Sequence, residues 1–170
     1  MKRIAFIGAP STGKSTTAEE LRKIVDIPVI EYISAGQFLK ANGFGINDAG
    51  TADTGKACIF FHKLSIATLD LLKDSSDSIV ILPRTILDPV IYDDVPISEE
   101  EVRNYFDKVD RIFYLPIETE LEKRKDRTES EDYRKMIDEK LLGVYKKYNI
   151  EFETLKGTPA EKAKKIKEVL

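Results

Sequence analysis

Cysteine, histidine and tryptophan are nearly missing from this chain of 170 residues, which has one Cys, one His and no Trp. A single cysteine, Cys58, excludes an internal disulfide and suits a reducing compartment, so the cytoplasm is the simplest expectation. One histidine without a cysteine cluster gives too few ligands for a structural zinc site. Disulfide scaffolds and zinc-binding modules are therefore set aside.

Long apolar runs and an excess of one charge are also missing. The run from Ile4 to Ile7 ends at Gly8 and is broken again at Pro10, which is too short for a signal peptide or a bilayer span. Lys and Arg number 27 against 30 Asp and Glu, for a net charge of -3. Such a balance gives no general attraction to nucleic acid or to an anionic membrane. We expect no membrane partner, and nucleic acid is the less favoured kind of partner.

The rest of the composition is that of an ordinary folded domain, with 42% hydrophobic and 34% charged residues. Short apolar strands alternate along it with amphipathic helices. Strands are predicted at 4–7, 28–30, 78–82, 111–115 and 151–155, and helices at 15–25, 34–41, 52–73, after Ser98, after Thr128 and from Pro159. This alternation predicts a single α/β domain over residues 1–170, with a parallel sheet covered by helices on both faces.

Some helix details follow from the same patterns. Helix 52–73 is expected to bury one apolar face, with His62 off that face and Cys58 as a small core residue. The face comprises Ala57, Phe60, Phe61, Leu64, Ala67 and Leu71. Capping boxes are predicted at Ser98 with Glu101 and at Thr128 with Glu131. The lysines of the last helix, 162, 164, 165 and 167, are expected on a solvated face.

The most informative motif is the segment from Gly8 to Ser15, GAPSTGKS, which fits G-x-x-x-x-G-K-[ST] between a predicted strand and a predicted helix. The two glycines allow the backbone to approach phosphates, and the start of the helix adds a positive end. Lys14 is placed to bridge the β- and γ-phosphates, and the Ser15 hydroxyl to bind magnesium. The sequence therefore predicts a P-loop for a nucleoside triphosphate, with ATP and Mg²⁺ as cofactors. The residues of this cradle are Gly8, Pro10, Ser11, Thr12, Gly13, Lys14, Ser15 and Thr16.

A P-loop alone does not distinguish kinases from ATPases, GTPases or motors. The N-K-x-D pattern that reads guanine is missing, and the chain is too small for the extra modules of a motor. The basic stretch 122–127 lies in a lid-like segment, about 117–134, that could close over the nucleotide and exclude water. Within it, Arg124 and Arg127 are candidates to contact the transferring phosphoryl group. These features favour a small-molecule kinase.

Several stretches resemble the nicotinamide-riboside-kinase-like (NadR-type) AAA ATPase/kinase family, which neighbours the deoxynucleoside and nucleoside monophosphate kinases and has small members in bacteriophages. The stretches are IAFIGAPSTGKSTTAEEL, PVIEY, RTILD, RIFYLP and LKGTPAEK, in that order along nearly the whole chain. The resemblance implies a three-layer P-loop NTPase fold whose five parallel strands follow the order 2-3-1-4-5.

The resemblance also implies roles for residues outside the P-loop. Glu31 would accept the proton of the acceptor hydroxyl or organise magnesium, at the sheet edge where open α/β sheets bind ligands. Arg84 would hold phosphates, and Asp88 would fix the substrate or Arg84. The turn containing Gly157 and Pro159 would pack against adenine. Candidate stacking surfaces for the acceptor are Tyr32, Phe44, Phe60, Phe61 and Tyr92.

One departure from the family pattern affects activity. Pro83 stands where an acidic residue is expected before Arg84, so magnesium would be held by Ser15, water and Glu31, or catalysis would be weakened or lost. The predicted reaction is transfer of the γ-phosphoryl group of ATP to a nucleoside, a nucleoside monophosphate or a related nucleotide acceptor. Two alternatives stay open: an ATPase or nucleotide-dependent switch that acts on a protein partner, and a kinase of a modified base or end in DNA.

Overall fold

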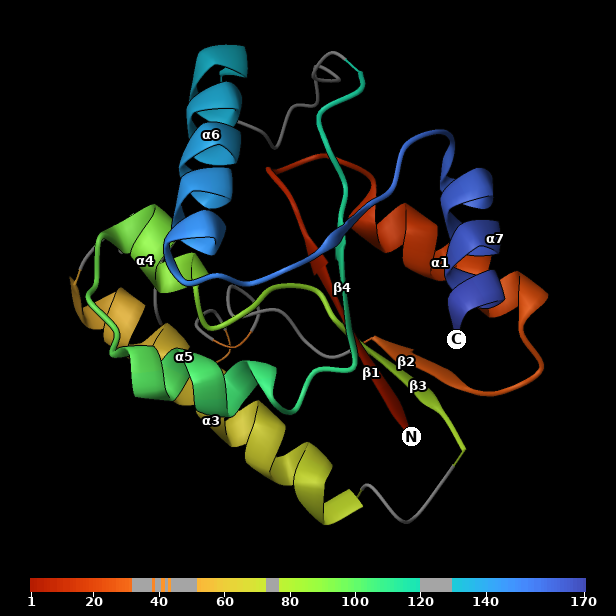
Figure 1. Ribbon diagram of the computed structural model, residues 1–170, viewed down its shortest axis with the longest axis horizontal. Coiled ribbons are helices and arrows are strands. Elements are labelled where there is room, and N and C mark those ends of the chain that lie inside the picture. Colours follow the sequence, from red (N-terminus) through yellow and green to blue (C-terminus); the bar gives the residue numbers. More distant parts are fainter. Residues whose placement is uncertain (32–37, 39–40, 42, 44–51, 73–76, 120–129) are drawn as a thin grey trace.

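The computed structural model describes residues 1–31, 38, 41, 43, 52–72, 77–119 and 130–170 (Figure 1). Its elements are β1 (Lys2–Ile7), α1 (Lys14–Ile24), β2 (Val29–Glu31), α3 (Ala52–Leu72), β3 (Ile79–Leu82), α4 (Asp88–Asp93), α5 (Glu99–Phe106), β4 (Arg111–Tyr114), α6 (Glu131–Lys147), β5 (Glu153–Thr154) and α7 (Pro159–Val169). The predicted helix at 34–41 and the loop at 43–50 fall almost wholly outside the described residues.

The strands form one parallel sheet of five strands in the order β2-β3-β1-β4-β5. Both the predicted α/β architecture and the strand order are thereby confirmed. In the register, Ile7 at the end of β1 pairs with Tyr114 at the end of β4. Because all strands run the same way, the segments that follow them meet at one edge of the sheet, where ligands of open α/β folds bind.

Side-chain alternation along the strands divides the core into two layers. Ala5 and Ile7 of β1 face the layer formed by α3, α4, α5 and α6, whereas Ile4 and Phe6 face the layer formed by α1 and α7. Figure 1 shows these two groups of helices on opposite sides of the sheet. The central strands are buried on both faces, as the apolar runs in the sequence predicted.

The buried face of α3 differs from the prediction. Phe60 and Leu64 were expected in the core, but they are 61% and 48% exposed. His62, expected off the buried face, is itself buried. Among the residues of α3 whose burial is described, the buried side chains follow helical spacing: Cys58, Phe61, His62, Ser65, Ile66 and Leu69. Because this face contains His62 and Ser65, an apolar pattern alone placed it wrongly, whereas Cys58 was correctly expected in the core.

Helix boundaries show where local signals were sufficient. The capping box of Ser98 and Glu101 is present at the start of α5. The box predicted at Thr128 is wrong, because α6 is capped by Ser130, whose hydroxyl accepts from the Tyr133 N–H at 3.1 Å. The short helix α4 was not predicted, since six residues give too little periodicity. In the described part of the chain, no helix combines the length and apolar character that a membrane crossing requires.

Candidate active site

The P-loop connects β1 to α1 and depends on backbone shapes that favour glycine. Gly8 has a φ of 141°, and a Cβ added there would lie 2.4 Å from the carbonyl oxygen of Leu115. Gly13, directly before α1, has a φ of 82°, and Ser11 also adopts a positive φ, of 63°. No side chain caps the start of α1. The first N–H groups of that helix therefore remain available to an anion.

Lys14 lies across the loop rather than extending away from it. Its Nζ donates to the carbonyls of Gly8 at 2.9 Å and Ala9 at 2.7 Å, and approaches the Thr12 hydroxyl at 3.3 Å. Burial, and after it the positive charge of Arg84, lowers the pKa of Lys14 to about 7. A triphosphate would favour the charged form of this lysine and compete for its three donor positions.

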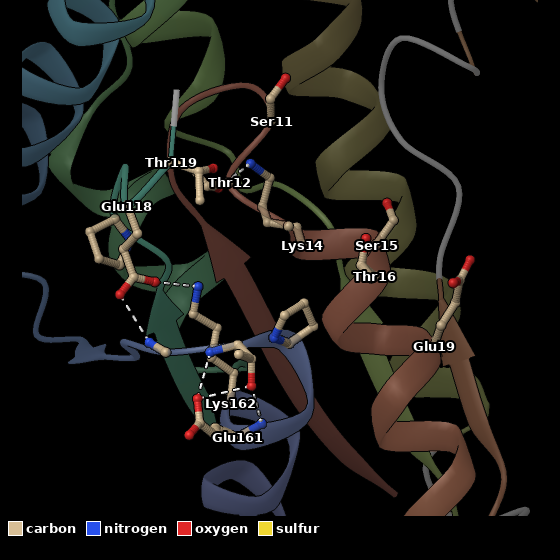
Figure 2. Close-up of a pocket in the computed structure, with 15 residues that line it drawn as sticks. Ser11, Thr12, Lys14, Ser15, Thr16, Glu19, Glu118, Thr119, Glu161 and Lys162 are labelled. Carbon is tan, nitrogen blue, oxygen red and sulfur yellow. Dashed lines mark hydrogen bonds and ion pairs between the residues drawn. The ribbon is translucent and has the colours of Figure 1, made fainter. Parts of the chain in front are cut away.

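A pocket of about 980 Å³ opens beside the P-loop and is closed on its far side by the turn before α7. Figure 2 shows Lys14 and Thr12 on one side of it and Glu118, Glu161 and Lys162 on the other. Its lining residues are Ser11, Thr12, Gly13, Lys14, Ser15, Thr16, Glu19, Pro116, Glu118, Thr119, Gly157, Thr158, Pro159, Glu161 and Lys162. The pocket thus joins six of the predicted cradle residues to Gly157 and Pro159, which lie more than a hundred positions further along the chain.

The far side of the pocket is fixed by a buried lysine. Lys162 was expected in solvent, but it is only 4% exposed and pairs with Glu118 at 2.6 Å. Glu118 also accepts from the backbone N–H of Gly157 at 2.9 Å. This carboxylate therefore ties the segment after β4 to the turn before α7 (Figure 2). The local run of lysines does not reveal the burial of Lys162, because its partner Glu118 lies 44 positions away in the chain.

Ser15, which lines the pocket, meets Glu31 at the end of β2. The Ser15 hydroxyl donates to Glu31 Oε1 at 3.4 Å, while Arg22 pairs with Glu31 Oε2 at 3.3 Å. A hydroxyl and a carboxylate at this separation suit Mg²⁺, which takes oxygen ligands and keeps several waters. Within the described residues, no cluster of three or more His, Cys, Asp or Glu side chains competes as a metal site.

Arg84, which follows β3, is held by two groups of α4. Its Nη1 donates to Asp88 Oδ1 at 2.8 Å and to the Tyr92 hydroxyl at 2.6 Å. The other Asp88 oxygen accepts from the Thr85 N–H at 2.6 Å. Burial opposes the charge of Arg84, but Asp88 and Tyr92 outweigh it and raise its pKa above its usual range. The guanidinium is therefore a fixed positive charge near Lys14.

Arg134, in the first turn of α6, was not singled out as a site residue from the sequence. It is fully buried, and its guanidinium donates to the carbonyls of Pro10 and Ser11 in the P-loop at 3.0 and 3.2 Å. One turn further along α6, Asp138 Oδ2 accepts from the Tyr114 hydroxyl at 2.5 Å. Charged residues usually lie in solvent, so helical spacing gave no signal that α6 turns these side chains towards the loop.

The remaining predicted residues fall into separate groups. Gly8 and Pro10 lie behind the pocket, where their carbonyls accept from Lys14 and Arg134. Phe60 is exposed, and Phe61 packs against Phe38 with ring centroids 4.8 Å apart. The predictions for Tyr32, Phe44, Arg124 and Arg127, and most of the lid-like segment, lie outside the described residues.

The sheet order and the shape of the loop between β1 and α1 together define a P-loop fold. A family model described as an AAA domain matches residues 3–162, and the chain belongs to this family. The comparison with curated proteins gave no match. The family relationship suggested by the sequence is thus established for the AAA domain, while the NadR-type subgroup remains a resemblance.

Solved structures of similar fold include three nucleotide complexes. The YorR protein from Bacillus subtilis, in complex with phosphorylated GDP, is 18% identical, covers 99% of this chain and 95% of its own, and has a TM-score of 0.64. Deoxyadenosine kinase from M. mycoides, with dCMP and dCDP bound, is 16% identical; the match covers 98% of this chain and 97% of that one, with a TM-score of 0.55. NadR protein, in complex with NAD and AMP-PNP, is 16% identical; the match covers 99% of this chain and 48% of that one, with a TM-score of 0.64. At these identities, the likeness shows a shared fold.

Proposed function

We propose that this protein is an ATP- and Mg²⁺-dependent kinase that transfers the γ-phosphoryl group to a nucleoside, a nucleoside monophosphate or a related nucleotide. The observation that carries the proposal is the placement of Lys14, Ser15, Glu31 and the Arg84–Asp88 pair at one edge of the sheet. Phosphoryl transfer needs mainly positioning and positive charge. The nucleotides bound to YorR, deoxyadenosine kinase and NadR support a nucleotide-type acceptor.

In this proposal the donor lies in the pocket beside the P-loop. The triphosphate contacts the loop N–H groups and Lys14, and the base packs against the turn of Gly157 and Pro159. Ser15 and Glu31 would hold magnesium, which would supply positive charge against that of the phosphates. The pocket supports this arrangement because it runs without interruption from the P-loop to that turn.

The acceptor lies on the side of Arg84. Its oxygen forms a bond to the γ-phosphorus while the bond from that phosphorus to the β,γ-bridging oxygen breaks, and ADP leaves. Lys14 and Arg84 neutralise the charge that develops, and Asp88 keeps Arg84 in place. The proton of an acceptor hydroxyl passes to Glu31, the carboxylate that accepts a hydrogen bond from the Ser15 hydroxyl. Arg124 and Arg127 are proposed as further phosphate contacts.

A second candidate is favoured by Pro83. This residue follows β3 where an acidic side chain would normally support magnesium, and Asp88 is already engaged by Arg84. A weakened metal site would suit a nucleotide-dependent switch acting on a protein partner better than rapid transfer. Transfer to a modified base or end in DNA is the remaining alternative.

The test is a transfer assay with γ-labelled ATP and Mg²⁺ over nucleosides, mononucleotides, nicotinamide riboside and short modified DNA. The proposal predicts a labelled small-molecule acceptor with the wild type and none with Lys14→Ala. Label found only in inorganic phosphate, at a rate that no nucleoside changes, would favour the switch. A labelled oligonucleotide would instead establish the DNA kinase.

A further inference from the structure

We propose that Arg134 is a positioning residue that holds the P-loop in its receptive shape and thereby sets the affinity for the triphosphate. This inference rests on the proposed donor site. It goes beyond the predicted phosphate contacts, because Arg134 is fully buried, does not line the pocket and acts on the loop backbone.

The contacts of Arg134 are all made from one planar group. Nε donates to the Pro10 carbonyl at 3.0 Å, and Nη2 to the Ser11 carbonyl at 3.2 Å. Nη1 donates to the Thr119 carbonyl at 2.8 Å and to Glu131 at 3.3 Å. The side chain is 0% exposed. One guanidinium therefore joins the P-loop, the segment after β4 and the first turn of α6.

The planar peptide unit explains how these contacts act on the pocket. In a trans peptide the C=O and the following N–H point in opposite directions. Anchoring the carbonyls of Pro10 and Ser11 towards α6 consequently directs the N–H groups of Ser11 and Thr12 the other way, and both residues line the pocket. Ser11 has a φ of 63°, which is unfavourable for a residue with a Cβ and must be stabilised by its surroundings.

Stability of the core does not account for a charge at this position. Burying a cation is costly, and an apolar side chain of similar size often stabilises a protein as well or better. Among the described residues, Glu131 is the one carboxylate that the guanidinium binds; its side chain is 35% exposed, and the three other acceptors are neutral carbonyls. The contact with Thr119 adds a further connection, since the adjacent Glu118 binds Gly157 on the far side of the pocket.

The experiment compares Arg134→Gln with Lys135→Gln, an equal charge change at the next, exposed position of α6. Binding of MgATP and of inorganic triphosphate is measured by calorimetry, together with amide exchange at residues 8–16 without nucleotide and the free energy of unfolding. We expect Arg134→Gln to weaken both ligands by about tenfold or more, since a lost hydrogen bond to a charged group has that magnitude. The affinity of Arg134→Lys for both ligands should lie between those of Arg134→Gln and the wild type. The affinity of Lys135→Gln should equal that of the wild type.

Faster exchange confined to the P-loop amides, with weaker triphosphate binding, supports the proposal. An Arg134→Gln protein that is less stable but binds triphosphate as the wild type does would overturn it, because the residue would then be structural only. If that variant does not fold, Glu131→Gln and its matched control Glu139→Gln replace it. Glu131→Gln should weaken binding by roughly twofold to threefold and speed P-loop exchange, and equal behaviour of the pair overturns the proposal. A wild type that binds no triphosphate refutes the donor site, whereas the amide exchange still decides whether Arg134 orders the loop.

Discussion

The Lys14 amine donates hydrogen bonds to two carbonyls of the P-loop. A bound triphosphate would replace these carbonyls as the acceptor. Its depressed pKa means that near neutral pH a substantial share of the protein carries the uncharged amine. Lys14 must therefore be protonated to attract a phosphate, so the affinity for the triphosphate depends on pH. At the scale of single residues, the site combines groups whose ionisation is tuned by burial with groups, such as Arg84, that stay charged.

MgATP binding should take up a proton above about pH 7, the pKa of Lys14 in the folded protein, because phosphates stabilise the charged amine. The affinity should accordingly fall as the pH rises from about 7 to 9. Calorimetry in buffers of different ionisation enthalpy measures this uptake directly. Lys14→Arg keeps a permanent charge and should show no linked proton, and an equally pH-independent affinity in the wild type would refute the assignment.

His62 makes acid stability a second test at the residue scale. Burial lowers its pKa to about 4 from an ordinary 6.5, and the facing charges are those of Asp88 and Arg84. Between these values the unfolded chain binds a proton that the folded protein does not, so stability is lost as the pH falls from 6.5 to 4. The loss attributable to His62 is about 3 kcal/mol. His62→Gln should remove this part of the pH dependence in urea unfolding, and an unchanged slope would contradict it.

Pro83 gives a prediction on the metal. Pro83→Asp introduces a carboxylate directly after β3, where it can support magnesium together with Ser15 and Glu31. The variant should need less Mg²⁺ for half-maximal turnover, by about threefold to tenfold. Pro83→Asn provides the matched control without the charge. An unchanged magnesium requirement in both variants would mean that the ligands already present are sufficient.

At the scale of strands and helices, local sequence patterns predicted some parts of the fold and missed others. The strands and the strand order followed from apolar runs and the resemblance, because buried parallel strands are nearly continuous in hydrophobicity. The buried face of α3 did not, since it contains His62 and Ser65. Nor could the burial of Arg134 and Lys162 be predicted, because their partners come from distant segments.

Two helical glycines predict opposite effects of one added methyl group. A Cβ at Gly55 of α3 would lie 2.3 Å from the Val95 Cγ2, whereas a Cβ at Gly143 of α6 would meet nothing within 4 Å. Gly143→Ala should stabilise the protein by about 0.5–1 kcal/mol through helix propensity. Gly55→Ala should destabilise it by roughly 1–3 kcal/mol through overpacking. Urea unfolding of the two variants measures both signs, and a stabilising Gly55→Ala would contradict the packing of α3 against Val95.

For the molecule as a whole, the sheet edge gathers groups from distant segments of the chain. The motif located the P-loop, and the resemblance indicated Glu31, Arg84 and the Gly157 turn. The buried connections between them, through Arg134, Glu118 and Lys162, became visible only in the folded structure. These connections are a property of tertiary packing, and a local motif contains no information about them.

The proposed kinase activity requires that the γ-phosphoryl group of ATP passes to an acceptor rather than to water. The most direct measurement is the product balance in a single reaction with Mg²⁺: ADP, phosphorylated acceptor and inorganic phosphate, followed together for each nucleoside or nucleotide. We predict one acceptor whose phosphorylated product equals the ADP formed, with little inorganic phosphate and no product from Lys14→Ala. Equal amounts of ADP and inorganic phosphate with every acceptor would contradict it.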